Sequence, residues 1–262
     1  MREVEYVKPS SLAEALTTLA GNDGARALAG GQTLINVMKA RAASPDALVD
    51  LSGIDDLKGI ELGADGTLSI GPMTTYAEII DSAEAKARPI LGAVCAQIAD
   101  VQVRNRGTIG GNLCSNDPTN HLPPLIAAIG AELTIAGLGG DRTVPAQDFF
   151  LGVYMTAVQQ GELLTRITIP AGRRDGFAAV TLGVDGTCIV NAAASANGSL
   201  RIALGCVDAV PVLVEAESPE QVREAVRAAK LRPPSDVHAS TEYRAHLAEV
   251  LAERAARQAV ER

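Results

Sequence analysis

The chain has no tryptophan, and aromatic residues make up only 3% of its 262 residues. Its apolar content is nevertheless 47%, much of it alanine, and such small side chains suit close packing of helices on sheets. A chain of this length can bury a substantial core and has room for two or three compact units. We therefore expect a globular protein in which small side chains let helices pack closely on sheets.

Excess positive charge and long apolar runs are also missing. The formal net charge is −8, so neither a nucleic acid nor an anionic membrane surface is favoured as a partner. No apolar run is long enough to cross a bilayer, so we expect no membrane span. The first six residues are acidic and strand-like, which is unlike a signal peptide. These features predict a cytoplasmic location.

The four cysteines do not form a metal-binding pattern. No pair among Cys95, Cys114, Cys188 and Cys206 has the short spacing of a zinc or iron–sulfur site. We expect buried or neutral thiols in a reducing compartment, and no metal site in this chain. Cys114 follows the second glycine loop described next, where it is expected to neighbour a ligand rather than react with it.

Two Gly-Gly pairs stand out against these absences. The first lies in Ala29-Gly-Gly-Gln-Thr33 and the second in Thr108-Ile-Gly-Gly-Asn112, each followed by an amide-bearing residue. Glycine allows close approach to backbone N–H groups, and consecutive N–H donors make a good anion site. Two such loops from distant parts of one chain predict a clamp around a diphosphate. No Gly-x-Gly-x-x-Gly follows the first strand, which disfavours a NAD-binding Rossmann domain.

Sequence patterns predict an α+β protein in three parts, with boundaries after residues 56 and 170. The first part, residues 1–56, is a small α/β unit with strands at 3–7, 25–29 and 48–51 and helices starting at Ser11 and Leu34. Ser11-x-x-Glu14 and Thr75-x-x-Glu78 both have the spacing of a capping box.

The second part, residues 57–170, begins within a polar connection that covers residues 52–66. Expected here are strands at 67–70, 132–136 and 163–169, helices at 89–99 and 123–129, and a strand edge or turn at 101–104. In the third part, residues 171–262, three strand-like runs at 178–182, 187–194 and 199–206 predict an antiparallel meander. Its turns are expected at Asp185-Gly186 and Asn197-Gly198. Two helices, at 219–230 and 240–260, are expected to close the chain.

The two glycine segments carry a family resemblance. Residues 29–39, AGGQTLINVMK, and residues 108–112, TIGGN, resemble the two FAD-binding signatures of molybdenum hydroxylase medium subunits. The chain looks most like the carbon monoxide dehydrogenase medium subunit and the FAD domain of xanthine dehydrogenase, up to Pro170. The resemblance implies a vanillyl-alcohol-oxidase-type fold, in which FAD lies between two subdomains, followed by a C-terminal antiparallel sheet with helices.

The resemblance also implies a set of cofactor-binding residues. In this set Gly30 to Leu34 contact the pyrophosphate, and the second loop forms the other half of the cradle. Ile98 corresponds to an apolar position near the cofactor, and Leu163 or Leu164 to a leucine against the flavin or adenine end, although core packing explains a single leucine equally well. The full set is Ala29, Gly30, Gly31, Gln32, Thr33, Leu34, Ile98, Thr108, Gly110, Gly111, Asn112, Asn120, His121, Leu163 and Leu164.

Three positions leave alternatives open. The family has an acid that binds ribose hydroxyls where this chain has His121, and imidazole has less acceptor capacity, so Asn120 or Asp117 is a candidate for the missing acceptor. A catalytic or metal-binding His121 is the other reading, but no second histidine or carboxylate pair is arranged with it. Arg104 or Arg106 offsets cofactor phosphate charge, faces a partner subunit, or lies on a solvent-facing edge of a strand or turn. The segment after Pro170 is shortened, so either Phe177 takes the family's aromatic role beside the flavin or the ring is more exposed.

By resemblance, the chain is an FAD-binding electron-transfer subunit with no catalytic residues of its own. Its expected partners are a large molybdenum-cofactor subunit and a small subunit with 2Fe–2S clusters, in a dimer of heterotrimers. Electrons would pass from the clusters to FAD and then to an acceptor such as NAD or a quinone. The alternatives are a scaffolding subunit with impaired FAD use and a stand-alone flavin oxidase, and the substrate would be set by another subunit.

Overall fold

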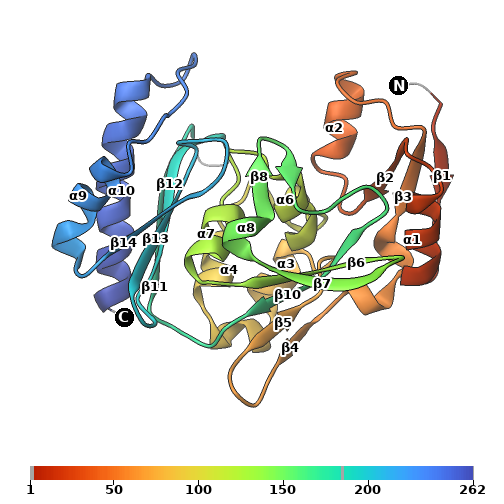
Figure 1. The fold of residues 1–262 in the computed structure, drawn as a ribbon, viewed down its shortest axis with the longest axis horizontal. Helices are drawn as coiled ribbons and strands as arrows, with labels where there is room; N and C mark the ends of the chain where they lie inside the picture. The colour runs from red at the N-terminus through yellow and green to blue at the C-terminus, as the bar shows by residue number, and fades with distance from the viewer. Residues whose placement is uncertain (1–2, 184–185, 262) are drawn as a thin grey trace.

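The computed structural model describes residues 3–183 and 186–261 (Figure 1). Its first sheet is parallel, in the order β1 (Glu5–Val7), β3 (Ala47–Asp50), β2 (Ala25–Leu28). Helices α1 (Leu12–Ala20) and α2 (Leu34–Lys39) connect these strands, as predicted. The predicted capping box of α1 is incomplete: Ser11 accepts from the Glu14 amide at 3.3 Å, but the Glu14 carboxylate accepts from the Ser10 amide.

The second sheet is antiparallel, with five strands. Its order is β4 (Ile60–Leu62), β5 (Leu68–Ile70), β10 (Leu163–Ile169), β6 (Glu132–Gly137), β7 (Gly140–Pro145). Residues 52–66 were predicted to be a polar connection, but part of this stretch forms strand β4. Strand β7 was not predicted at all. Both are edge strands with mostly exposed or half-exposed residues, so neither shows a strong apolar alternation.

Short helices pack on this sheet. They are α3 (Tyr76–Asp81), α4 (Ile90–Cys95), α5 (Val101–Arg104), α6 (Ile109–Ser115), α7 (Leu122–Ala128) and α8 (Ala146–Phe149). The predicted capping box of α3 is present, but the helix expected at 89–99 stops at Cys95. The expected strand edge or turn at 101–104 is a helical turn, because the Asp100 side chain accepts from the Val103 amide at 2.8 Å and caps it.

The C-terminal sheet has four antiparallel strands: β11 (Asp175–Thr181), β12 (Cys188–Ser195), β13 (Leu200–Gly205) and β14 (Val212–Ala216). The prediction of a three-stranded meander was therefore one strand short. The predicted turn at Asp185-Gly186 lies outside the described residues. Helices α9 (Val222–Ala228) and α10 (Thr241–Glu261) cover one face of this sheet, while its other face packs towards α7 (Figure 1).

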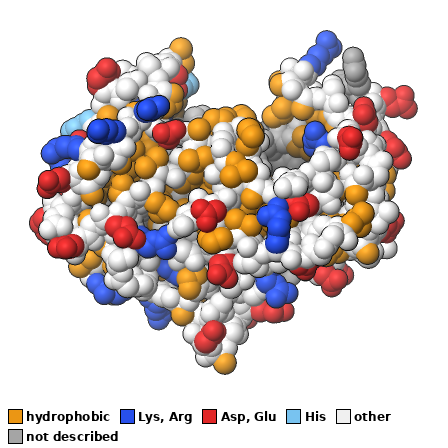
Figure 2. Space-filling view, in the orientation of Figure 1, with side chains coloured by type: hydrophobic (Ala, Val, Ile, Leu, Met, Phe, Trp, Pro, Cys, Tyr) orange, Lys and Arg blue, Asp and Glu red, His pale blue; other side chains and the backbone are white. Residues whose placement is uncertain are grey.

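Hydrophobic side chains gather at the surface over the middle of the molecule (Figure 2). Four exposed hydrophobic residues, Leu151, Val153, Tyr154 and Met155, lie in and between β8 (Phe150–Gly152) and β9 (Met155–Thr156). In the described part of the chain, no helix combines the length and the apolar character needed to span a membrane. The domain boundaries after residues 56 and 170 stay predictions.

Candidate cofactor site

The two glycine loops meet in space. A side chain at Gly30 would overlap the carbonyl oxygen of Arg106, just before the second loop. A methyl group at Gly111 would lie 3.4 Å from the Ala29 side chain. Glycine at both positions thus allows the loops to lie against each other, as expected for two halves of one site.

A groove of about 360 Å³ opens beside the first loop. It is lined by Tyr6, Leu28, Ala29, Gly30, Gly31, Gln32, Ile35, Asn36, Lys39, Asp50 and Arg106. Burial raises the pKa of Asp50, but hydrogen bonds from Tyr6 and Ser52 outweigh it and the pKa is lower than usual. The groove therefore combines one carboxylate with two cations, Lys39 and Arg106.

The first loop has unpaired backbone donors. The amides of residues 30–34 donate to no acceptor anywhere in the described ranges 3–183 and 186–261. Gly31 has a φ of +74°, a left-handed conformation that glycine adopts without strain. Gln32 Nε2 donates to the Gly30 carbonyl oxygen at 3.0 Å, which holds the loop together. Of these five residues, Gly30, Gly31 and Gln32 line the groove with the two cations, and free N–H groups in such a setting suit a diphosphate.

The second loop differs, because its amides bond within the protein. Ile109 donates to the Thr74 carbonyl oxygen at 3.0 Å and Gly110 to that of Pro72 at 2.8 Å. Gly111 donates to Thr108 Oγ1 at 3.1 Å, which makes Thr108 the cap of α6. We expected this loop to offer free N–H groups as well. The three bonded amides are therefore not free for a ligand, and contact of the second loop with a cofactor stays a prediction.

Other predicted site residues lie behind the second loop. Asn112 is buried, and its Oδ1 has no hydrogen-bond partner among the described residues. Asn120 Nδ2 donates to the Asn112 carbonyl oxygen at 3.1 Å and ties the following loop to α6. Leu163 and Leu164 are both buried, in different core clusters, and Ile98 packs against the cluster that holds Leu164. Their contact with a cofactor stays a prediction.

His121 faces the C-terminal sheet. Its side chain is 7% exposed, and Asn191 Nδ2 lies 3.2 Å from its Nδ1 atom. The Phe177 ring packs edge-on against the imidazole, with centroids 5.4 Å apart. Neither residue lines the groove beside the first loop. A contact of His121 with ribose and a contact of Phe177 with the flavin both stay predictions.

Comparison with known proteins agrees with this geometry. Residues 2–172 match the family described as the FAD binding domain in molybdopterin dehydrogenase. The chain belongs to this family. It is therefore an FAD-binding component of the oxidoreductases called molybdenum hydroxylases, similar in structure to the medium chain of carbon monoxide dehydrogenase.

Individual relatives extend the similarity over the whole chain. The carbon monoxide dehydrogenase medium chain of Afipia carboxidovorans is 38% identical over 97% of this chain and 96% of its own length. The glyceraldehyde dehydrogenase medium chain of Sulfolobus acidocaldarius is 39% identical over 68% of this chain, and the match spans 63% of that relative. A solved carbon monoxide dehydrogenase from Hydrogenophaga pseudoflava has a TM-score of 0.91 at 33% identity, covering 99% of this chain and 98% of that one.

The groove fits the FAD of this family, and it includes residues that the sequence did not indicate. Tyr6, Asn36 and Asp50 line it but were placed only in secondary structure. A usable signal was present: ligands of α/β sheets bind at the carboxyl ends of the strands. Strands β2 and β3 are parallel, so Asp50 and the first glycine loop emerge at the same sheet edge.

Proposed function

We propose that this chain is the FAD-binding electron-transfer subunit of a multi-subunit molybdenum hydroxylase. In this proposal a small partner subunit carries 2Fe–2S clusters, and a large partner holds the molybdenum cofactor and oxidises the substrate. The observation that carries the proposal is the run of five free backbone amides where the two glycine loops meet, three of them in residues that line the groove with Lys39 and Arg106. The exposed apolar residues of the β8–β9 region support a chain that works within a larger assembly.

The chain's own residues bind and orient the cofactor. The amides of residues 30–34 bind the pyrophosphate, Lys39 and Arg106 balance its charge, and Asp50 accepts from a hydroxyl. Residues 1–56 and 57–170 form the two subdomains of a vanillyl-alcohol-oxidase-type fold, and residues 171–262 form the third domain. The flavin ring of FAD supplies the redox chemistry, while the protein supplies placement and electrostatics.

The purified complex is expected to show flavin absorption and to release FAD rather than FMN, because only FAD has a pyrophosphate for the free amides to bind. Mass spectrometry should identify two co-purifying chains, and their presence should be required for the substrate to reduce the flavin. FMN, or no flavin in an intact complex, would contradict the proposal. Flavin reduction by substrate with this chain alone would favour a stand-alone oxidase.

Arg106→Gln is expected to weaken FAD binding roughly threefold to tenfold, about the net value of one hydrogen bond, 0.5–1.5 kcal/mol. The reason is that Arg106 lines the groove, so its loss leaves phosphate charge balanced by Lys39 alone. Titration of the apoprotein with FAD at low and high salt measures the change, which should shrink as salt screens the charge.

Arg104→Gln is the matched control. The Arg104 guanidinium donates to the carbonyl oxygens of Ile98 at 3.1 Å and Ala99 at 2.5 Å, and Arg104 does not line the groove. Its replacement should leave FAD affinity unchanged. Equal losses in both variants would mean that Arg106 acts through general surface charge rather than at the cofactor.

A further inference from the structure

Two irregularities in the C-terminal sheet turn two cysteines onto the face that carries Asn191. In β12, Val190 pairs with Val180 and Cys188 pairs with Thr181, so Ile189 is an extra, bulged residue. Ile189 and Val190 both pack in the core cluster beneath α10. Because side chains alternate along a strand, the bulge moves Cys188 to the opposite face, which it shares with Asn191. Cys188 Sγ lies 3.4 Å from Asn191 Nδ2.

Cys206 reaches the same face of the sheet through an unusual backbone conformation. It follows directly after β13 and has a φ of +65°, a left-handed conformation that non-glycine residues rarely adopt. Its Sγ lies 3.9 Å from Asn191 Nδ2. An outlier of this kind persists only where the surrounding structure enforces it, and such outliers cluster at functional sites. Two independent distortions therefore place both sulfurs around one amide nitrogen.

The cluster is buried and polar. Cys188, Cys206, His121 and Asn191 are all at most 7% exposed. Besides the two sulfurs, Asn191 Nδ2 lies 3.2 Å from both His121 Nδ1 and the Asn120 carbonyl oxygen. An amide group has two hydrogens, so it cannot donate to all four neighbours at once. Within the described chain, Asn191 Oδ1 has no partner either, which is unusual for a buried polar atom.

These contacts favour a thiolate at Cys188. Hydrogen bonding from the Cys206 thiol, opposed by burial and helped by His121, lowers the pKa of Cys188 to about 5. The same pairing raises the pKa of Cys206. The charge of Asp117 also raises this pKa, whereas the charge of Arg244 lowers it. By contrast, burial raises the pKa of the Cys95 and Cys114 thiols to about 12. The cluster thus holds one proton between two sulfurs at neutral pH.

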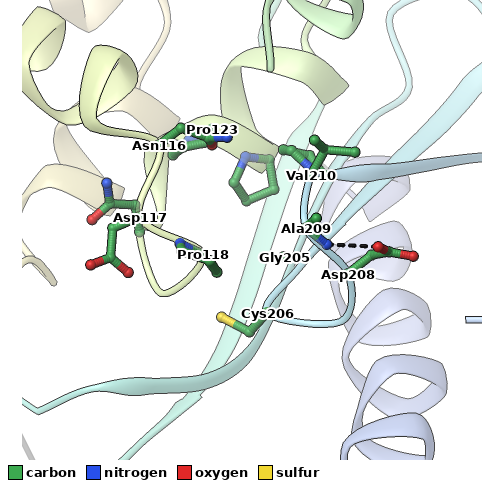
Figure 3. Close-up of a pocket in the computed structure, with 12 residues that line it drawn as sticks. Asn116, Asp117, Pro118, Pro123, Gly205, Cys206, Asp208, Ala209 and Val210 are labelled. Carbon is green, nitrogen blue, oxygen red and sulfur yellow. Dashed lines mark hydrogen bonds between the residues drawn. The ribbon is translucent and has the colours of Figure 1, made fainter. Parts of the chain in front are cut away.

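A small cavity reaches Cys206, the cysteine that shares the Asn191 amide with Cys188. Its volume is about 10 Å³, enough for one water-sized molecule. Asp117, Pro118 and Cys206 are among its lining residues, and Figure 3 shows the Cys206 sulfur on the side where Asp117 and Pro118 lie. A hydroperoxide is small enough to use such a route, whereas a bulky thiol reagent is not.

We propose that Cys188 and Cys206 are a peroxide-oxidisable dithiol that closes reversibly into a disulfide between β12 and the end of β13. The Cys188 thiolate attacks one oxygen of hydrogen peroxide, so that an S–O bond forms, the O–O bond breaks and hydroxide leaves. The Cys206 sulfur then attacks the Cys188 sulfenic acid: the S–S bond forms, the S–O bond breaks, and the Cys206 proton leaves with the hydroxyl as water. A dithiol reductant reverses the bond by thiol–disulfide exchange.

The test treats the full-length, FAD-containing protein with hydrogen peroxide, blocks free thiols and maps the peptides by mass spectrometry. The expected result is a Cys188–Cys206 cross-linked peptide that dithiothreitol removes. In Cys206→Ser, unfolding the peroxide-treated protein in the presence of dimedone should instead trap a sulfenic acid at Cys188. Cys114→Ser is the matched control and should cross-link like the parent protein, because its thiol is protonated and takes no part.

The pH dependence separates an activated pair from ordinary thiols. The parent should cross-link at a similar rate from pH 8 down to pH 6, because the thiolate persists, whereas the rate of an unactivated thiol falls about tenfold per pH unit. His121→Gln should slow cross-linking at pH 6 more than at pH 8, with the fold checked by circular dichroism. The proposal is overturned if Cys188 and Cys206 stay reduced while Cys95 or Cys114 is oxidised, or if the parent shows the tenfold dependence.

Discussion

Gly30→Val is expected to weaken FAD binding and lower the FAD content of the purified protein. The new side chain would overlap the backbone carbonyl oxygen of Arg106, which cannot rotate away as a side chain can, so the first loop must separate from the second. Overpacking of this kind costs typically about 1–3 kcal/mol. If that cost falls on the bound form, FAD affinity drops by roughly 5-fold to 150-fold. The FAD-to-protein ratio after purification and titration of the apoprotein with FAD measure the loss.

Two further glycine variants make this result specific. A side chain at Gly111 would meet Thr108 Oγ1 at 2.9 Å, a side chain that can shift, so Gly111→Val should weaken FAD binding less than Gly30→Val does. Gly139, in the β6–β7 turn, has nothing within 4 Å of an added side chain, so Gly139→Val should keep full FAD content. If Gly30→Val bound FAD as tightly as Gly139→Val, the meeting of the loops would not form the cofactor site.

Arg88→Met is expected to cause the largest loss of stability among the substitutions considered. Arg88 and Asp175 are 2% and 1% exposed, and the guanidinium makes two bonds of 2.8 Å to the carboxylate. Arg88 also donates to the Pro170 carbonyl oxygen, so it joins the second sheet region to the start of β11. Removing one partner leaves a buried, unpaired carboxylate, which costs about 3–5 kcal/mol of unfolding free energy. Denaturant titration followed by circular dichroism measures the change.

The exposed pair of Arg227 and Glu249 is the matched control. It is also a two-bond contact, at 3.0 and 2.7 Å, but Arg227 is 64% exposed, so Arg227→Met should cost no more than about 1 kcal/mol. The double variant Arg88→Met, Asp175→Leu should regain stability, because it leaves no unpaired charge. Equal losses for Arg88→Met and Arg227→Met would show that burial does not set the strength of the Arg88 pair.

Local sequence determined the elements that carry strong local signals. The strand before the first glycine loop, the capping box of α3 and the two C-terminal helices all appear where their patterns predicted them. Each depends on residues within a few positions of one another, which is why a sequence can specify them. The edge strands β4, β7 and β14 did not stand out, because each is short and lies largely outside the cores, so pairing with a neighbour rather than its own pattern defines it.

The family and its cofactor were also readable from sequence, because the glycine loops are contiguous motifs. Which loop keeps its amides free for a ligand was not, since this depends on partners far along the chain. Residues 72 and 74 take the amides of Gly110 and Ile109, whereas no residue takes those of residues 30–34 in the described structure. The same reason separates Arg106 from Arg104, which lie two positions apart but bond in different directions.

The dithiol shows most clearly what only the tertiary structure decided. Cys188 and Cys206 are too far apart in sequence to suggest a metal or redox motif, and in regular antiparallel strands both side chains would lie on the sheet face opposite Asn191. A bulge at Ile189 and a left-handed Cys206 bring both sulfurs to Asn191, opposite His121 from another part of the chain. Sequence determined which chemical groups are present, and the irregular backbone of two paired strands decided that they meet.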